Sequence, residues 1–225
     1  MQKNECNDDQ IIELDYKIDS GLGVRANLGV IVLSSDQTLE YELRALLNFE
    51  GVVFYHSRIP NDMEITNHGL FKMEAEIQKV AALLPNSFNF NAIGYGCTSG
   101  ATIIGEDKVE REIQRIHPEI PCTNPLTAAK AAFRSLGIKR IGLLTPYDPK
   151  ITREMRDNFS NNGFNVPVTG SFFQSDDFIV GKISSESIFK SIINIGAREE
   201  CDGVFVSCTN LRVVKIISKA ENELG

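Results

Sequence analysis

The sequence predicts an α/β fold built from two similar halves with mostly parallel sheets. Short apolar runs rich in β-branched and aliphatic residues alternate with longer stretches whose apolar residues recur at helical spacing. The dipeptide Cys-Thr also follows two of the apolar runs, at Cys97 and at Cys208. Because a strand, a helix and the next strand connect by a right-handed crossover, this alternation favours parallel pairing.

The apolar runs predict the strands. Each run is bounded by polar, glycine or proline residues, as strands of a buried sheet are. In chain order the predicted strands are 27–33, 52–56, 91–96, 140–145, 165–173 and 202–207. Residues 1–26 do not fit the alternation and are expected to form an N-terminal extension.

Helices are predicted between and after these strands. Pro85 ends the second helix, and Gly137 ends the fourth because glycine accepts the left-handed conformation that follows many helices. Gly105 interrupts the third helix, and Ser184 or Ser185 caps the sixth. In chain order the predicted helices are 37–49, 67–84, 99–116, 123–136, 149–162, 184–197 and 211–224.

An internal repeat indicates that the two halves are copies of one unit. The two Cys-Thr motifs lie 111 residues apart (208 − 97), and the same offset places the first predicted strand on the fourth. Agreement of independent strands at one offset is typical of a duplicated unit. We therefore expect a first half at 27–137 and a second half at 138–225, related by a pseudo-two-fold axis.

The same offset predicts that the second half is shortened at its C-terminus. Copies of the segment at 119–123 and of the helix that ends at residue 137 would fall at about 230–248, whereas the sequence ends at residue 225. We expect the second half to be incomplete by about 23 residues (248 − 225). An unpaired sheet edge and uncovered apolar surface would result, and these favour a homo-oligomer.

Composition and charge exclude several classes of function. The 225 residues are 42% hydrophobic and 24% charged, which is ordinary for a globular protein. The net charge of −7 repels polyanions, so no nucleic-acid partner is expected. The N-terminus lacks the apolar stretch of a signal peptide, and no apolar run approaches the ~20 residues that span a bilayer. No membrane partner is expected either.

The cysteine and histidine content indicates a cytoplasmic protein without a metal site. An odd number of cysteines, five, in a chain without a signal peptide favours reduced thiols. The cysteines never have C-x-x-C spacing, and the three histidines do not form a zinc-binding pattern with them. We expect no metal.

Cys97 and Cys208 are the candidate catalytic residues. Each follows the carboxyl end of a predicted strand, where open α/β folds bind ligands, so the repeat would place them on opposite sides of one small ligand. Polar residues and a predicted helix follow each cysteine. Free N–H groups at the start of that helix should lower the pKa of the thiol below its usual ~8.5 and suit a substrate carboxylate. The candidate ligand-binding residues at these two helix starts are Thr98, Ser99, Thr209 and Asn210.

Two facing thiols support two kinds of reaction without a cofactor. One thiolate can remove a proton from a carbon while the other thiol returns a proton on the opposite face, which racemises or epimerises that carbon. Alternatively, one thiolate adds to an activated double bond, the other thiol protonates the adjacent carbon, and rotation followed by elimination gives cis–trans isomerisation. The thiols alone are compatible with both reactions.

Five motifs resemble the aspartate/glutamate racemase superfamily. Within it, the chain is similar to the branch of maleate cis–trans isomerases and arylmalonate decarboxylases. Its motifs are most similar to those of the racemase-like ectoine-utilisation proteins. The resemblance covers roughly residues 27–225 and implies two Rossmann-like halves, a cleft between them, and no metal or organic cofactor. The motifs are S-S-D-Q-T (34–38), Y-G-C-T-S-G (95–100), T-N-P-L-T-A-A (123–129), G-L-L-T-P-Y (142–147) and S-C-T-N-L-R (207–212).

The resemblance also implies roles for individual residues. Cys97 matches the first family thiol, the nucleophile of the isomerases, and Cys208 matches the second, the acid. Tyr147 matches a tyrosine that holds a substrate carboxylate. Asp36 and Asp177 stand where maleate isomerases carry asparagines. Replacing two hydrogen-bond donors by anions disfavours a dicarboxylate and favours a substrate with an amino group.

The sequence therefore predicts a cofactor-independent racemase or isomerase of a small, amino-acid-like carboxylate, such as an intermediate of ectoine degradation. One alternative is a maleate cis–trans isomerase. The other is a non-catalytic carboxylate-binding protein on a degenerate racemase scaffold, in which the polar residues near the cysteines only cap helices.

Overall fold

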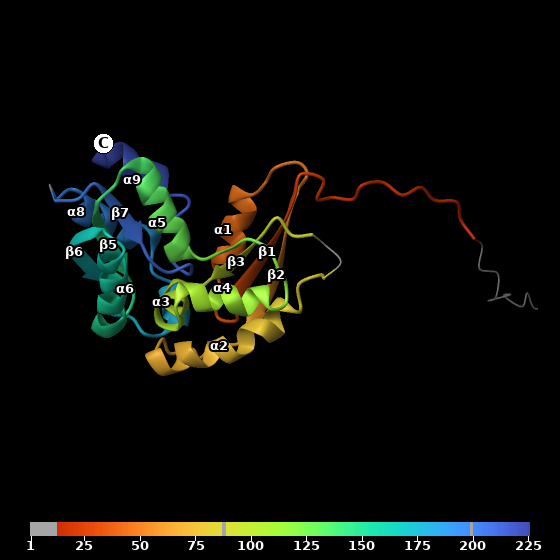
Figure 1. Ribbon diagram of the computed structural model, residues 1–225. Coiled ribbons are helices and arrows are strands. Elements are labelled where there is room, and N and C mark those ends of the chain that lie inside the picture. The colour runs from red at the N-terminus through yellow and green to blue at the C-terminus, as the bar shows by residue number, and fades with distance from the viewer. Residues whose placement is uncertain (1–12, 87–88, 199) are drawn as a thin grey trace, which may run out of the picture.

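The computed structural model describes residues 13–86, 89–198 and 200–225, and within them the chain forms two sheets (Figure 1). The first sheet has the strand order β2-β1-β3-β4 and the second has the order β6-β5-β7. Neighbouring strands within both sheets are parallel, which confirms the predicted α/β class. The strands are β1 (Ala26–Leu33), β2 (Val52–Ile59), β3 (Ala92–Gly96), β4 (Cys122–Thr123), β5 (Arg140–Thr145), β6 (Asn165–Ser171) and β7 (Gly203–Val206).

The two sheets share one strand order. The strands β1, β2 and β3 hold the same relative places as β5, β6 and β7, and Cys97 and Cys208 each follow the third of these strands. This agrees with the repeat at an offset of 111 residues, although the pseudo-two-fold relation itself stays a prediction. In the described part of the chain, the second sheet has no strand that corresponds to β4.

Local signals set the starts of the helices. The side chains of Asn124 and Asp148 each accept two backbone N–H groups and cap α5 and α6, with a proline beginning each helix. Gly105 has φ +99° and separates α3 from α4, as its position predicts. The helices are α1 (Leu39–Leu46), α2 (Asn67–Ala81), α3 (Thr98–Ile104), α4 (Glu106–Gln114), α5 (Pro125–Leu136), α6 (Pro149–Asn161), α7 (Asp177–Val180), α8 (Ser185–Gly196) and α9 (Ile217–Leu224).

The last predicted helix is wrong in its first half. Helix α9 begins at Ile217 rather than at residue 211. Leu211 is buried, the backbone N–H of Val214 donates to the Glu42 carboxylate at 2.9 Å, and the Arg212 guanidinium donates to the Ile183 carbonyl at 2.8 Å. These contacts with other elements replace the hydrogen bonds that a helix over 211–216 would make.

The structure tests only in part the predicted N-terminal extension and the prediction that the protein has no membrane partner. Residues 1–12 of the predicted extension lie outside the described residues, and residues 13–25 run away from the first sheet (Figure 1). Among the helices of the described residues, none is long and apolar enough to cross a membrane.

Helix α5 comes from the first predicted half but packs against the second sheet. The ring of Phe133 lies 6.2 Å from that of Phe159 on α6, 5.8 Å from that of Phe164 and 6.3 Å from that of Phe205 on β7. Such edge and tilted ring contacts stabilise an apolar core beyond the area they bury. The predicted boundary at residue 137 stays a prediction, but the packing shows that the two halves share this helix.

The position of Phe133 makes a stability prediction. Phe133 is 8% exposed, so Phe133→Ala leaves a cavity among three aromatic rings and should lower the free energy of unfolding by about 3–5 kcal/mol. Urea unfolding followed by circular dichroism measures this. The control is Phe71→Ala on α2, where the ring is 51% exposed and the change should stay within about 0.5 kcal/mol. Equal losses in the two variants would contradict the role of α5.

Candidate active site

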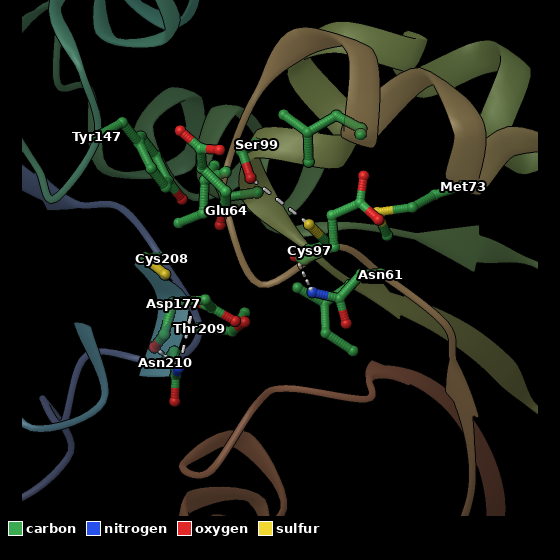
Figure 2. Close-up of a pocket in the computed structure, with 16 residues that line it drawn as sticks. Asn61, Glu64, Met73, Cys97, Ser99, Tyr147, Asp177, Cys208, Thr209 and Asn210 are labelled. Carbon is green, nitrogen blue, oxygen red and sulfur yellow. Dashed lines mark hydrogen bonds between the residues drawn. The ribbon is translucent and has the colours of Figure 1, made fainter. Parts of the chain in front are cut away.

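A narrow pocket lies between the two halves and is lined by residues from both (Figure 2). Cys97 approaches it from the end of β3, and Cys208 faces it from the segment after β7. The pocket is small in this conformation, with room for little more than an ordered water.

Cys97 is the N-cap residue of α3, as the sequence predicts for a cysteine just before a helix. The Gly100 N–H donates to its Sγ at 3.2 Å, and the Ser99 hydroxyl lies 3.7 Å from the same sulfur. Burial nevertheless raises the pKa of the Cys97 thiol to about 11, although these two contacts act to lower it. The predicted lowering of the pKa by the helix start is wrong because desolvation of the thiolate outweighs it.

Cys208 differs from Cys97 in its backbone. Its φ is +97°, an unfavourable conformation for a residue with a Cβ that costs about 1–3 kcal/mol. No helix starts behind it, since the irregular segment that follows leads to α9 only at Ile217, so the predicted helix start at Cys208 is wrong. Burial, and then the charge of Asp177, raise the pKa of the Cys208 thiol well above its usual value.

Tyr147 lies beside Cys208 with its side chain fully buried. Its hydroxyl oxygen accepts a hydrogen bond from the Ser207 hydroxyl at 3.3 Å. Burial, and then the negative sulfurs of Cys208 and Cys97 when ionised, raise the pKa of Tyr147 well above 10, so the hydroxyl keeps its proton. Tyr147 can therefore donate a hydrogen bond into the pocket, as the sequence resemblance implies.

The two aspartates singled out in the sequence occupy different places. Asp177 lines the pocket and is almost fully buried, with its carboxylate accepting hydrogen bonds from the Ser35 hydroxyl and from Asn210 Nδ2. Asp36 lies behind the pocket wall and is not among the lining residues. Its carboxylate accepts a hydrogen bond from the Thr209 hydroxyl at 2.8 Å and also accepts backbone N–H groups at the start of α1. The structure therefore does not place Asp36 where it would contact the substrate directly.

Asn210 joins the two halves at the edge of the pocket. Its Oδ1 accepts the Gln37 N–H at 2.9 Å, its Nδ2 donates to the Asp177 carbonyl at 2.8 Å, and its own carbonyl accepts the Thr38 hydroxyl at 3.0 Å. The side chain is nearly fully buried. Asn210 therefore holds the wall together rather than offering polar atoms to a ligand.

The remaining predicted binding residues lie where the sequence places them. Thr98, Ser99 and Thr209 all line the pocket, together with both cysteines. The Thr209 hydroxyl also donates a hydrogen bond to the Gly96 carbonyl at 3.1 Å, so Thr209 too bridges the halves. The structure brings every sequence-predicted site residue except Asp36 to the pocket wall.

One wall of the pocket was missed by sequence reasoning. The segment after β2 contributes Asn61, Asp62 and Glu64, and it crosses to the second half, where the Ile65 N–H donates to the Ser175 carbonyl at 2.8 Å. The repeat gave no motif in this segment. Its polar residues just beyond the carboxyl end of a strand were the available signal.

Comparison with known proteins shows the family of this chain. Residues 63–225 match the family model described as arylmalonate decarboxylase. The chain belongs to this family. The match confirms the resemblance to the branch of maleate isomerases and arylmalonate decarboxylases, while the similarity to ectoine-utilisation proteins stays a prediction.

Curated relatives of this family member are maleate isomerases. The enzyme from Geobacillus stearothermophilus is 24% identical over 211 residues, which cover 88% of this chain and 84% of the relative. The enzyme from Alcaligenes faecalis is 22% identical over 212 residues, which cover 88% of this chain and 83% of the relative.

Solved structures share the fold. The maleate isomerase Iso from Pseudomonas putida S16 superposes with a TM-score of 0.80 at 22% identity, over 88% of this chain and 85% of that chain. The Nocardia farcinica maleate cis–trans isomerase has a TM-score of 0.80 at 20% identity, over 89% and 85% of the two chains. That second structure is of a cysteine-to-serine variant with a covalently bound succinylcysteine intermediate.

Asp177 makes a prediction about stability and pH. Burial raises the pKa of Asp177 from its usual 3.8, so between 3.8 and the higher folded value the folded protein binds more protons than the unfolded chain, and stability falls as pH rises. Asp177→Asn has no such titration. We expect its free energy of unfolding to rise relative to the parent protein between about pH 4 and pH 7, by ~1.4 kcal/mol for each unit of the shift.

Urea unfolding at several pH values measures this change. The control is Asp157→Asn, at an exposed position on α6, where the side chain is 58% exposed and no such pH-dependent gain is expected. A difference between Asp177→Asn and the parent protein that does not vary with pH would contradict the prediction.

Proposed function

We propose that this member of the arylmalonate decarboxylase family is a cofactor-independent isomerase of a small carboxylate, and that cis–trans isomerisation of a maleate-like substrate is its reaction. The observation that carries the proposal is the pair of thiols, the buried Cys97 and the partly buried Cys208, which reach one pocket from two different halves. The maleate isomerase relatives support it. These relatives favour cis–trans isomerisation over racemisation, which is the main prediction from the sequence.

The environments of the two thiols fit different roles. Cys97 is the N-cap of α3, and the Gly100 N–H and the Ser99 hydroxyl contact its sulfur, so this thiol is placed to carry a negative charge. Cys208 has no helix start behind it, and the charge of Asp177 acts to keep its thiol protonated, which suits the role of acid. This assignment matches the roles that the sequence resemblance implies.

The proposed reaction proceeds through a covalent adduct. The Cys97 thiolate adds to one carbon of the double bond, a C–S bond forms, and the electron pair moves to the adjacent carbon, which takes the proton of Cys208. The carbon–carbon single bond then rotates. Cys208 removes that proton again, the C–S bond breaks, and the trans product leaves with Cys97 restored as thiolate. Tyr147 holds a substrate carboxylate by donating its hydroxyl hydrogen.

Serine substitutions at the two cysteines test this mechanism. Cys97→Ser should lower turnover of maleate to fumarate by at least about a hundredfold, because a serine hydroxyl is a poor nucleophile without a base. Cys208→Ser should also lose turnover. It should accumulate a covalent adduct on Cys97, because water can still protonate the adjacent carbon, whereas the base that removes this proton before the C–S bond breaks is missing. Proton NMR of the products and intact-protein mass spectrometry measure both results.

Cys201→Ser serves as the control, because Cys201 lies outside the pocket and should retain full turnover. Turnover in the parent protein that survives Cys97→Ser would contradict the assignment of the nucleophile.

The charges of the pocket favour a second candidate, racemisation of an amino acid or its derivative. The ionisable carboxyl groups of Asp62, Glu64 and Asp177 line the pocket, and its wall contains no lysine, arginine or histidine among the described residues. A dianion such as maleate would meet these carboxyl groups without a cationic partner, whereas a substrate with one carboxylate and one ammonium group would gain partners. The predicted relation to ectoine utilisation belongs to this candidate.

Solvent deuterium distinguishes the two candidates. If the protein is a racemase, incubation of amino acids and acetylated diaminobutyrates in D₂O should exchange the hydrogen at Cα, and Cys97→Ser should abolish the exchange. If it is a maleate isomerase, maleate is converted and no Cα exchange occurs. Binding of carboxylates by calorimetry with neither reaction would instead identify the non-catalytic binding protein.

Assembly and location remain part of the proposal. We propose a homo-oligomer, because β7 is an edge strand of its sheet and an apolar groove beside it is formed by α5, α8 and α9. A cytoplasmic location agrees with the free thiols of the four described cysteines. Light scattering coupled to gel filtration measures the oligomeric state.

A further inference from the structure

Tyr95 carries a buried hydroxyl that lies beside Cys97 without making a well-formed hydrogen bond in the resting protein. Among the described residues, only Tyr95 OH and Ser57 Oγ are buried side-chain polar atoms without a hydrogen-bond partner. Tyr95 is 1% exposed, so its hydroxyl has given up hydration by water. A buried donor left unpaired is costly and rare in folded proteins, so the position of this hydroxyl calls for a physical explanation.

The unpaired hydroxyl lies next to the sulfur of Cys97. Tyr95 is on β3, two residues before Cys97, and both groups converge on Gly100 in α3. A Cβ placed at Gly100 would lie 2.7 Å from the Tyr95 hydroxyl oxygen and 3.0 Å from Cys97 Sγ. Any side chain at this position would push against both atoms. Gly100 therefore keeps open the space in which the hydroxyl and the sulfur meet.

The hydroxyl can act only as a donor toward this sulfur. Burial, and then the neighbouring Cys97, raise the pKa of Tyr95 well above 10, so the phenol keeps its proton at neutral pH. A neutral thiol is a weak acceptor, whereas a thiolate is a strong one. The O–H can rotate about its C–O bond, so a hydrogen bond that is absent beside the thiol can form when the sulfur becomes negative.

We propose that Tyr95 is a positioning residue whose hydroxyl donates a hydrogen bond to the Cys97 thiolate and stabilises it. The proposal rests on the function proposed above in one respect only: Cys97 must act as a thiolate, which both candidate reactions require. No atom is transferred to or from Tyr95. The Gly100 N–H and the Ser99 hydroxyl already contact Sγ, so Tyr95 supplies a third donor from inside the protein, away from the pocket that Tyr147 and Cys208 line.

Tyr147 places a hydroxyl beside Cys208 much as Tyr95 places one beside Cys97, but only Tyr147 lines the pocket. The hydroxyl of Tyr147 lies beside Cys208 but already accepts a hydrogen bond from Ser207, and Tyr147 lines the pocket. Tyr95 has no such partner within the described residues and does not line the pocket. The chain thus places one tyrosine where it can touch substrate and another where it can act only through Cys97.

Tyr95→Phe tests the proposal, because it removes the hydroxyl and keeps the ring that packs in the core. The rate of Cys97 alkylation by iodoacetamide, followed as a function of pH by peptide mass spectrometry, reports the fraction of thiolate without any substrate. We expect the rate profile to shift to higher pH by about one unit, so that alkylation at a given pH falls about tenfold. Turnover should fall through kcat, with KM unchanged, because Tyr95 does not line the pocket.

Ser57→Ala is the matched control. It removes the other unpaired buried hydroxyl, which lies in the same sheet on β2. We expect an unchanged alkylation profile in this variant and a stability equal to or above that of the parent protein. Urea unfolding of both variants verifies that they fold.

The outcomes separate this proposal from the proposed function. A folded Tyr95→Phe protein with an unchanged alkylation profile would overturn the role of Tyr95, whether or not the parent protein turns over a substrate. A shifted profile in a protein that isomerises and racemises nothing supports the role of Tyr95 and contradicts the proposed function alone. A shift of equal size in Ser57→Ala would mean that removing any hydroxyl from this sheet disturbs Cys97, and it too would overturn the proposal.

Discussion

The seam between the two halves is held by polar interactions, and the geometry of the site depends on them. Asn210 uses its side chain and its carbonyl to bond Gln37, Thr38 and Asp177, while Thr209 bonds Asp36. Because Asn210, Thr38, Asp36 and Asp177 are buried, breaking one of these hydrogen bonds would leave an unpaired donor or acceptor in the interior. The network therefore fixes how closely the cysteine after β3 approaches the cysteine after β7.

Burial at this seam has a chemical consequence. A helix start alone would favour a thiolate at Cys97, yet desolvation raises its pKa to about 11. A buried thiol can serve as nucleophile only if the protein supplies donors that replace water around its charge. The Gly100 N–H and the Ser99 hydroxyl are two such donors, and the proposed Tyr95 hydroxyl is a third. Cys208, which lacks a helix start and faces Asp177, stays protonated and suits the role of acid.

The family and the charges of the pocket lead toward different substrates. The relatives are named maleate isomerases, and maleate is a dicarboxylate. The fold that this chain shares with a solved maleate isomerase extends over most of both chains. The pocket wall of this chain instead carries the acidic side chains of Asp62, Glu64 and Asp177. A fold is shared by proteins of different activity, so the residues of the site decide the substrate. In both proposed reactions the two thiols perform the proton transfer or the addition.

The sequence by itself determined the strand–helix alternation, the repeat and the position of both cysteines at strand ends, because these depend on local periodicity and on spacing along the chain. Only the tertiary structure decided what depends on contacts between distant segments. It placed Asp36 behind the wall, brought Glu64 into it, packed α5 on the second sheet and left residues 211–216 without a helix. It also reversed the expected pKa shift of Cys97, since desolvation depends on how many atoms surround a sulfur and not on which residues follow it.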